Sequence, residues 1–322
     1  MDNPPKIKAV RKFKLYKHLS IIGQTGINSE DIEIAQRGIK VQTAHSLRGI
    51  KTFVESHGGT LRDIVSVEAY LSSSMKPQTY QRIPATNPFH EGFDKYYRDF
   101  FRYNLPLEES HYRPALSLVE VASLPFSERE GTLLFQNQHP LIELNALAII
   151  RNKEGYSHEM VETENTSYLG RNTSKAVVAD IGSKLHVEIA GQIGRQPPLS
   201  WEGMIRDPYR QISQIFDNIN GILWEIFGTV DDITEMRVWA TEDVLQTLCF
   251  SKYFDNFYEH FFSSRLSPDN KNYRPNVKKI KVVSIPKRPS YADRDPVPIM
   301  VATSALIKKS DIRKRKKEYA EN

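Results

Sequence analysis

The sequence predicts an α+β protein made of two tandem β-β-α-β-α-β-β modules, in which two helices cover one face of each sheet. Three observations predict this fold class. Short sequence blocks recur in the same order in both halves of the chain. Each half carries a helical period of apolar residues, followed by strand-like alternation. The length of 322 residues fits two domains, since a domain usually has roughly 100–200 residues.

The repeat consists of five blocks. In the first half they read IIGQTG, GGTLRDIVSVEAYL, FDKYYRDFF, HYRP and PLIELNALAII, starting at Ile21, Gly58, Phe93, His111 and Pro140. In the second half they read IAGQIG, FGTVDDITEMRVWA, FDNFYEHFF, NYRP and VPIMVATSALI, starting at Ile189, Phe227, Phe254, Asn272 and Val297. Blocks that keep one order over this length indicate a duplicated module.

The first helix of each module is predicted from apolar residues spaced three and four apart. They are Ala44, Leu47, Ile50 and Phe53 in the first module, and Ile212, Ile215, Ile219, Ile222 and Ile226 in the second. Both helices are expected to end at a left-handed glycine, at Gly58 or Gly59 and at Gly228.

The remaining elements follow in order. Alternating apolar residues predict a half-buried strand after each first helix, at Val65–Leu71 and Met236–Ala240. A second helix carries the Tyr and Phe clusters, and two further strands follow in each module. The open face of each sheet needs cover, which packing of sheets within the chain or between chains would supply.

The predicted organisation has four parts. Residues 1–150 form the first module, and residues 151–182 form a polar connecting segment. Residues 183–307 form the second module, and residues 308–322 form a basic tail.

The composition narrows the class of protein. Hydrophobic residues make up 39% and charged residues 26%, as in soluble globular proteins. Since no apolar run approaches the ~20 residues of a membrane span, no membrane association is expected. The single cysteine excludes a disulfide framework and suggests a cytoplasmic location. Neither zinc-ligand spacing nor a phosphate-binding loop is present, so no metal and no cofactor is implied.

The net charge of +5 is concentrated at the two ends of the chain. Such ends could bind the backbone of a nucleic acid or an acidic partner. Solvated tails explain the same pattern, and the sequence favours them over a nucleic-acid partner.

Several motifs resemble the RidA/YjgF family. The most specific are SLVEVASLP at Ser117–Pro125 and AGQIG at Ala190–Gly194, and the resemblance extends over nearly the whole chain. It implies an enzyme that hydrolyses reactive imines and enamines, in trimers with clefts between neighbouring subunits. A homo-oligomer, or pseudo-symmetric packing within the chain, is therefore expected. The layout is also similar to that of chorismatases, tandem relatives that split the enolpyruvyl group from chorismate.

The chain departs from the family at its functional positions. The arginine that clamps the substrate carboxylate is replaced by Leu116 and Val277. The glutamate that positions the attacking water is replaced by Asn145 and Ala302. An asparagine near the second helix is replaced by aspartate, Asp94 in one copy and Asp255 in the other. Altered chemistry is therefore expected.

The repeated Tyr-Arg-Pro phrase offers a substitute for the missing clamp. Arg113 and Arg274 stand three residues before the missing arginine. This odd offset would point them to the opposite face, but the following proline could produce a bulge that returns them. The alternative interpretation is a strand-entry device in which the arginine pairs with Asp94 or Asp255.

The candidate residues fall into two groups. Glu143, Glu120, Asp94 and Asp255 are the candidate proton-handling residues. The candidate substrate-binding residues are Arg113, Arg274, Tyr112, Tyr273, Asn145, Gln24 and Gln192. Three functions stay open: an enzyme acting on a small carboxylate-bearing imine, enamine or enol ether, which would fit a biosynthetic pathway; a chorismatase-like hydrolase; and a catalytically inactive ligand-binding or scaffolding protein.

Overall fold

The structure is a computed structural model that forms two compact units. It describes residues 6–12, 16–25, 38–72, 88–121, 124, 141–151, 157–163, 173–194, 207–246, 248–270, 272–282, 285 and 299–321. The first unit spans Met1–Asn152, and the second includes Lys153–Ile285 and Arg294–Asn322. Each unit has its own sheet and core.

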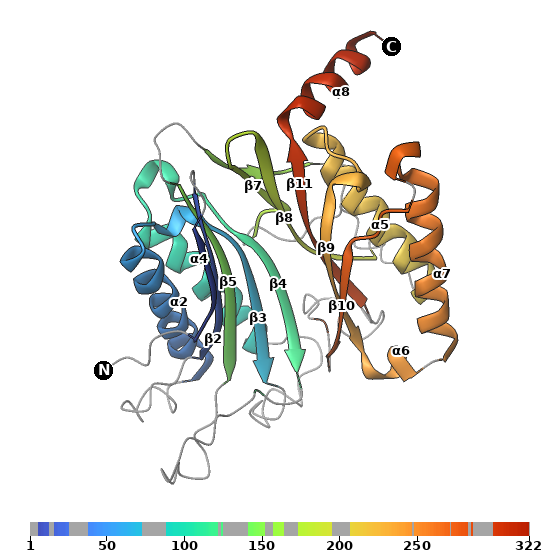
Figure 1. Ribbon diagram of the computed structural model, residues 1–322. Helices are drawn as coiled ribbons and strands as arrows, with labels where there is room; N and C mark the ends of the chain where they lie inside the picture. The colour runs from blue at the N-terminus through green and yellow to red at the C-terminus, as the bar shows by residue number, and fades with distance from the viewer. Residues whose placement is uncertain are drawn as a thin grey trace. The chain divides into compact units, whose positions relative to one another are not determined.

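The first unit is a five-stranded sheet with the order β1-β2-β5-β3-β4. The strands are β1 (Lys6–Lys12), β2 (Tyr16–Thr25), β3 (Ile64–Ser72), β4 (Ala115–Val121) and β5 (Ile142–Arg151). Helices α2 (Gly38–Ser56) and α4 (Pro88–Asn104) cover one face of this sheet (Figure 1). Apolar residues from both helices and from alternate positions of β2, β3 and β5 form the core.

The second unit is a six-stranded sheet with the order β10-β9-β11-β8-β7-β6. The strands are β6 (His158–Val161), β7 (Ala176–Asp180), β8 (Lys184–Ile193), β9 (Ile233–Thr241), β10 (Asn276–Val282) and β11 (Ile299–Lys308). Helices α5 (Pro208–Glu225) and α7 (Leu248–Arg265) cover one face, and a short helix α6 (Glu242–Gln246) precedes α7. Apart from the added β6, the strand order repeats that of the first unit.

The two sheets also share their register. Ser20 lies opposite Leu147 in the first sheet, and their counterparts Glu188 and Ser304 lie opposite each other in the second. The pairing of β3 with β5 corresponds in the same way to the pairing of β9 with β11. The predicted α+β fold class is therefore right, and both units have the topology and register expected of two tandem modules.

The first helix of each unit ends in the same hydrogen-bond pattern. The first unit uses Gly58, one of the two glycines expected, whereas the second unit departs from the prediction. Gly58 has φ of 81° and Phe227 has φ of 55°, so phenylalanine takes the left-handed position in the second unit, where Gly228 was predicted. Gly228 is needed for another reason. A Cβ atom there would lie 2.8 Å from Cδ1 of Ile307 and 3.2 Å from the carbonyl oxygen of Leu223, so glycine favours the close approach of the helix end to the sheet.

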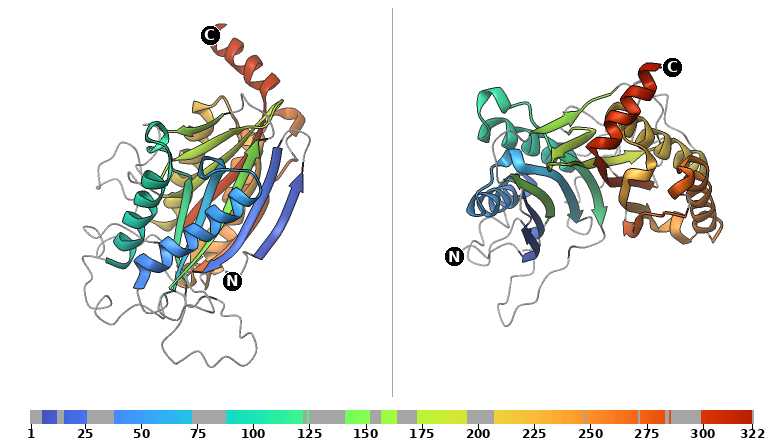
Figure 2. Two further views of the ribbon diagram at one scale, coloured as in Figure 1. Left: turned by 90° about the vertical axis from the view of Figure 1, so that its left-hand side faces the viewer. Right: turned by 45° about the horizontal axis from the view of Figure 1, so that its top comes forward.

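Two segments are more ordered than the sequence suggested. Strands β6 and β7 lie within residues 151–182, which were predicted as a connecting segment, and both pair in the second sheet. Edge strands expose one side and tolerate polar residues, so β6 carries no apolar signal. The predicted tail forms helix α8 (Lys309–Glu321), which continues from β11 (Figure 2).

The left-handed glycine at the end of α2 gives a direct test of the helix cap. We expect Gly58→Ala to lower the free energy of unfolding by about 1–2 kcal/mol, because a side chain disfavours this φ. No atom within 3.4 Å would crowd the added methyl group, so the loss reports backbone strain. Urea unfolding measures it. Gly58→Asn should lose less, because asparagine tolerates the left-handed region; an equal loss would contradict the assignment.

Candidate functional site

The tyrosine of each Tyr-Arg-Pro phrase fixes the start of a neighbouring strand. The hydroxyl of Tyr112 donates to the carbonyl oxygen of Ile64 at 2.7 Å. The hydroxyl of Tyr273 donates to the carbonyl oxygen of Ile233 at 2.6 Å. These isoleucines are the first residues of β3 and β9. The tyrosines therefore hold equivalent strand junctions in both units.

The arginine of each phrase binds the turn that contains it. Nη1 of Arg113 donates to the carbonyl oxygens of Ser110, at 2.8 Å, and of the preceding tyrosine. Burial lowers the pKa of Arg113. Nη1 of Arg274 donates to its preceding carbonyl at 2.7 Å, while Nε and Nη2 bind Glu259 and Ser263 on α7 at 2.8 Å. These contacts favour the strand-entry interpretation over a substrate clamp.

The two candidate aspartates differ in their surroundings. Oδ1 of Asp255 forms an ion pair with Nζ of Lys279 at 2.6 Å. Arg274 pairs instead with Glu259, which lies one helical turn further along α7. Asp94 lies half-buried on α4. Burial raises the pKa of Tyr97, and the charge of Asp94 adds to this rise.

The structure separates the two candidate glutamates of the first unit. Leu116 and Leu118 of β4 pack in the core beneath the helices, and Glu120 shares their face by alternation. Leu144 of β5 also belongs to this core, which puts the adjacent Glu143 on the opposite face of the sheet. Glu120 and Glu143 therefore cannot act together in one site of this unit.

The candidate amide side chains of Asn145, Gln24 and Gln192 contact the protein itself. Oδ1 of Asn145 accepts a hydrogen bond from the backbone amide of Gly23 at 2.9 Å, at a bulge where Gly23 has φ of 70°. Gln24 lies against α2, because a Cβ atom on Gly49 would come within 2.3 Å of its Oε1. Gln192 is buried, and its Nε2 donates to the carbonyl oxygen of Ala190 at 2.9 Å.

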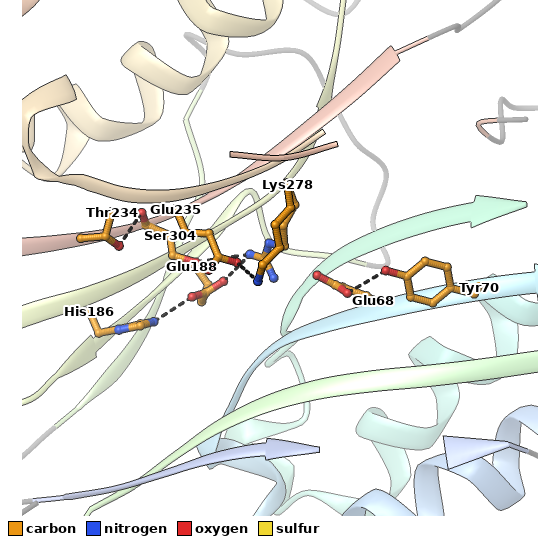
Figure 3. Close-up of polar contacts among 9 residues, drawn as sticks. Glu68, Tyr70, His186, Glu188, Thr234, Glu235, Lys278 and Ser304 are labelled. Carbon is orange, nitrogen blue, oxygen red and sulfur yellow. Dashed lines mark hydrogen bonds and ion pairs between the residues drawn. The ribbon is translucent and has the colours of Figure 1, made fainter. Parts of the chain in front are cut away.

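The second unit contains a polar cluster that the sequence-based candidates did not include. Glu188, on β8, is fully buried. Its Oε1 accepts from Nε2 of His186 at 2.8 Å, and its Oε2 accepts from Nη2 of Arg237 at 2.7 Å. Ser304 also hydrogen-bonds to Glu188, with its Oγ 3.4 Å from Nη2 of Arg237. Figure 3 shows His186 bonded to the Glu188 carboxylate, with Ser304 nearby. We call Glu188, His186, Arg237 and Ser304 the Glu188 cluster.

Small residues on the central strand permit this convergence. Strand β11 lies between β8 and β9, where Ser304 stands opposite Glu188 and Ala302 stands opposite Arg237. Because both side chains are short, the guanidinium of Arg237 reaches across β11 to the carboxylate. Val187 belongs to the core beneath the helices, so the cluster occupies the opposite face of the sheet.

The cluster holds Glu188 ionised. Burial alone would raise the pKa of Glu188, but the charge of Arg237 and the hydrogen bonds from His186 and Ser304 outweigh it. The pKa falls from 4.5 to about 2. The site therefore presents a fixed carboxylate, an imidazole oriented by that carboxylate, and a guanidinium.

The first unit has no equivalent cluster among its described residues. The positions of Glu188, Arg237 and Ser304 are taken there by Ser20, Glu68 and Leu147. Glu68 instead accepts from the hydroxyl of Tyr70 at 2.9 Å (Figure 3). The sequence signal for the cluster was a charged residue inside each of two apolar strands, HVEIAG and MRVWA.

The described part of the chain lacks two kinds of feature. No group of three or more His, Cys, Asp or Glu side chains there could hold a metal ion. None of its helices has the length and apolar character needed to cross a membrane.

Comparisons with known proteins support the resemblance for the first module. Residues 9–129 match the family model described as endoribonuclease L-PSP, which is the RidA/YjgF family. The match covers less than half of the chain. It therefore supports the resemblance for the first module alone. The comparison with curated proteins gave no match.

Solved structures of single-module proteins also align with the chain. Yeast Mmf1 is 18% identical, covering 47% of this chain and 100% of its own, with a TM-score of 0.34. The YjgF gene product of E. coli is 19% identical, covering 47% and 98%, with a TM-score of 0.34. YyfA from Yersinia pestis is 18% identical, covering 46% and 98%, with the same TM-score. The fold assignment rests on the strand order and register of the two sheets.

The hydrogen bonds from Tyr112 and Tyr273 to the first residues of β3 and β9 predict that loss of either hydroxyl lowers stability, to different extents. Tyr112→Phe should lower the free energy of unfolding by about 1–3 kcal/mol, because it removes a hydrogen bond from a buried carbonyl. Tyr273→Phe should lose less, because Tyr273 is only half-buried. Denaturant unfolding of both variants measures the difference. Wild-type stability in Tyr112→Phe would show that the hydroxyl does not hold β3.

The low pKa of Glu188 predicts how stability depends on pH. The folded pKa lies below the unfolded value of 4.5, so the contribution is fully present above about pH 5 and is lost as the pH falls toward 2. Its size is on the order of 3 kcal/mol. Urea unfolding from pH 7 to pH 3 should therefore show a steeper loss for wild type than for Glu188→Gln.

The variant and its control separate this effect from general acid sensitivity. At pH 7, Glu188→Gln should already be less stable, because Arg237 loses its charged partner. Glu235→Gln, which removes a carboxylate paired with Lys278 at 3.1 Å, should keep the wild-type slope. If Glu188→Gln kept that slope too, the cluster would not hold an ionised carboxylate.

Proposed function

We propose that this protein is a tandem RidA-like enzyme that acts on a small carboxylate-bearing imine, enamine or enol ether through the Glu188 cluster of its second module. The single observation that carries the proposal is the convergence of His186, Arg237 and Ser304 on the buried Glu188 carboxylate. A cytoplasmic location and a homo-oligomeric or intrachain pairing of sheets belong to the same proposal.

Each side chain of the cluster has a distinct role in this proposal. Arg237 replaces the family's missing arginine as the clamp for the substrate carboxylate. The Arg237 side chain is 13% exposed, and a guanidinium offers five N–H donors in a planar fork that matches a carboxylate. Glu188 fixes the ring of His186 by accepting from Nε2, which directs Nδ1 to proton transfer.

The reaction follows from these roles. Water adds to the carbon of a protonated imine, and the resulting carbinolamine loses ammonium to leave a carbonyl group. His186 takes a proton from the attacking water and returns it to the departing nitrogen. For an enol ether such as chorismate, the same residue would protonate the enol carbon before water adds. No cofactor is needed for either reaction.

A catalytically inactive ligand-binding protein is the second candidate. It is favoured because the residues that replace the family's arginine and glutamate serve the fold. Leu116 packs in the core, and the Asn145 side chain binds the amide of Gly23. In this case the Glu188 cluster would bind a small carboxylate without turnover.

A kinetic comparison tests the proposal. Freshly generated 2-aminoacrylate-type imines and chorismate serve as substrates, with the release of ammonia or 2-oxo acid as the readout. We expect His186→Gln to lower kcat by about 100-fold or more, because it removes proton transfer. Arg237→Lys should chiefly raise KM, because an ammonium cannot form the paired contacts of a guanidinium.

The chain offers a matched control in His18→Gln, since His18 holds the position of His186 in the first module. This variant should keep wild-type kinetics. Lost turnover in Arg113→Ala or Arg274→Ala, with Arg237→Lys unaffected, would return the clamp to the Tyr-Arg-Pro arginines. Carboxylate binding without turnover in wild type would favour the second candidate.

A further inference from the structure

Helix α8 is anchored to the second unit by one of its faces. Nη1 of Arg315 binds the carbonyl oxygen of Phe227 at 2.8 Å and Oδ2 of Asp232 at 2.7 Å. Ile312 packs against the core, and Nζ of Lys309 pairs with Asp180 at 2.6 Å. These contacts hold helix α8 against the second unit.

The side of α8 next to the anchored face carries exposed cations, of which Arg313 and Lys316 follow at three-residue spacing in line with Tyr319. Ile312, Arg315 and Tyr319 follow at three and four residues, so they share the anchored face. The exposed lysines and arginine of this helix are Arg313, Lys314, Lys316 and Lys317. Lys314 and Lys317 lie 3.8 Å from Glu318 and Glu321. Exposed pairs at this distance bind weakly, so these cations can exchange partners.

Two exposed aromatic rings border the cations. Trp224, near the end of α5, is 59% exposed, and Tyr319 of α8 is 64% exposed. Their ring centroids lie 5.5 Å apart at an interplanar angle of 78°. Nζ of Lys316 lies 4.7 Å from the ring centroid of Phe227, which places a cation beside the same helix end.

We propose that this surface, formed by the cations of α8 with Trp224 and Tyr319, binds single-stranded nucleic acid. The cations would contact successive phosphates, and unpaired bases would stack on the two rings, the combination that such ligands require. A polyanion without bases would contact the cations but could not stack on the rings of Trp224 and Tyr319. A lipid surface is disfavoured, because Ile312 packs against the core and two aromatic rings alone do not form the broad apolar face of a membrane-binding helix.

The binding experiment uses the full chain and a labelled 12-nucleotide oligouridine. Fluorescence anisotropy at low salt should give a Kd of about 10–100 µM, the range of non-specific electrostatic binding. Arg313→Gln combined with Lys316→Gln should weaken binding about 10-fold and reduce the slope of log Kd against log salt by about 1.4. Circular dichroism checks that helix α8 persists.

A matched control removes the same charge elsewhere in the unit. Lys279→Gln combined with Lys281→Gln, on β10, should leave the affinity unchanged. Equal weakening by the two double variants would mean that net charge alone attracts the oligonucleotide, and the proposal would fail.

The aromatic variants test the role of the bases. Trp224→Ala and Tyr319→Ala should each weaken oligouridine binding about 10-fold, without changing the binding of inorganic polyphosphate. Tyr319→Phe should bind as wild type does. Polyphosphate binding as tight as oligouridine binding, or tighter binding to anionic phosphatidylserine vesicles, would overturn the proposal.

Discussion

The alternation of side chains along each strand, with helices on one side only, is the constraint on which both units depend. It assigns every strand residue either to the core or to the opposite face. This alternation places Glu120 on the face that the helices cover and Glu143 on the opposite face. It also allows Glu188 and Arg237, from strands on either side of β11, to meet over Ala302. The face without helices is therefore where the two modules can differ without disturbing their cores.

The repeated Tyr-Arg-Pro phrase shows how a recurring motif can belong to folding. Tyr112 and Tyr273 make the same bond to the same strand position, and both arginines bind the carbonyl before them. A role in the topology of each module explains why both copies keep the phrase. A shared function in substrate binding would not require identical backbone contacts.

The sequence was sufficient for the fold class, the order of the elements and the alignment of the modules, because these depend on periodicity and turn chemistry. It was not sufficient for β6, whose polar composition suits an edge strand. The Glu188 cluster was missed because its members lie on three strands and meet only through register. Phe227 was missed because the preference for a left-handed glycine is statistical, and contacts from α8 offset the strain at this site.

Phe227 links the end of α5 to the C-terminal helix α8. Its left-handed backbone is disfavoured by about 1–2 kcal/mol, yet Arg315 binds its carbonyl and Lys316 lies over its ring. The end of α5 and the C-terminal helix should therefore open as one cooperative unit in hydrogen exchange. A shortened chain lacking α8 would keep the left-handed backbone of Phe227 without the contacts that offset its strain, so helix α8 stabilises the end of the helix that precedes β9.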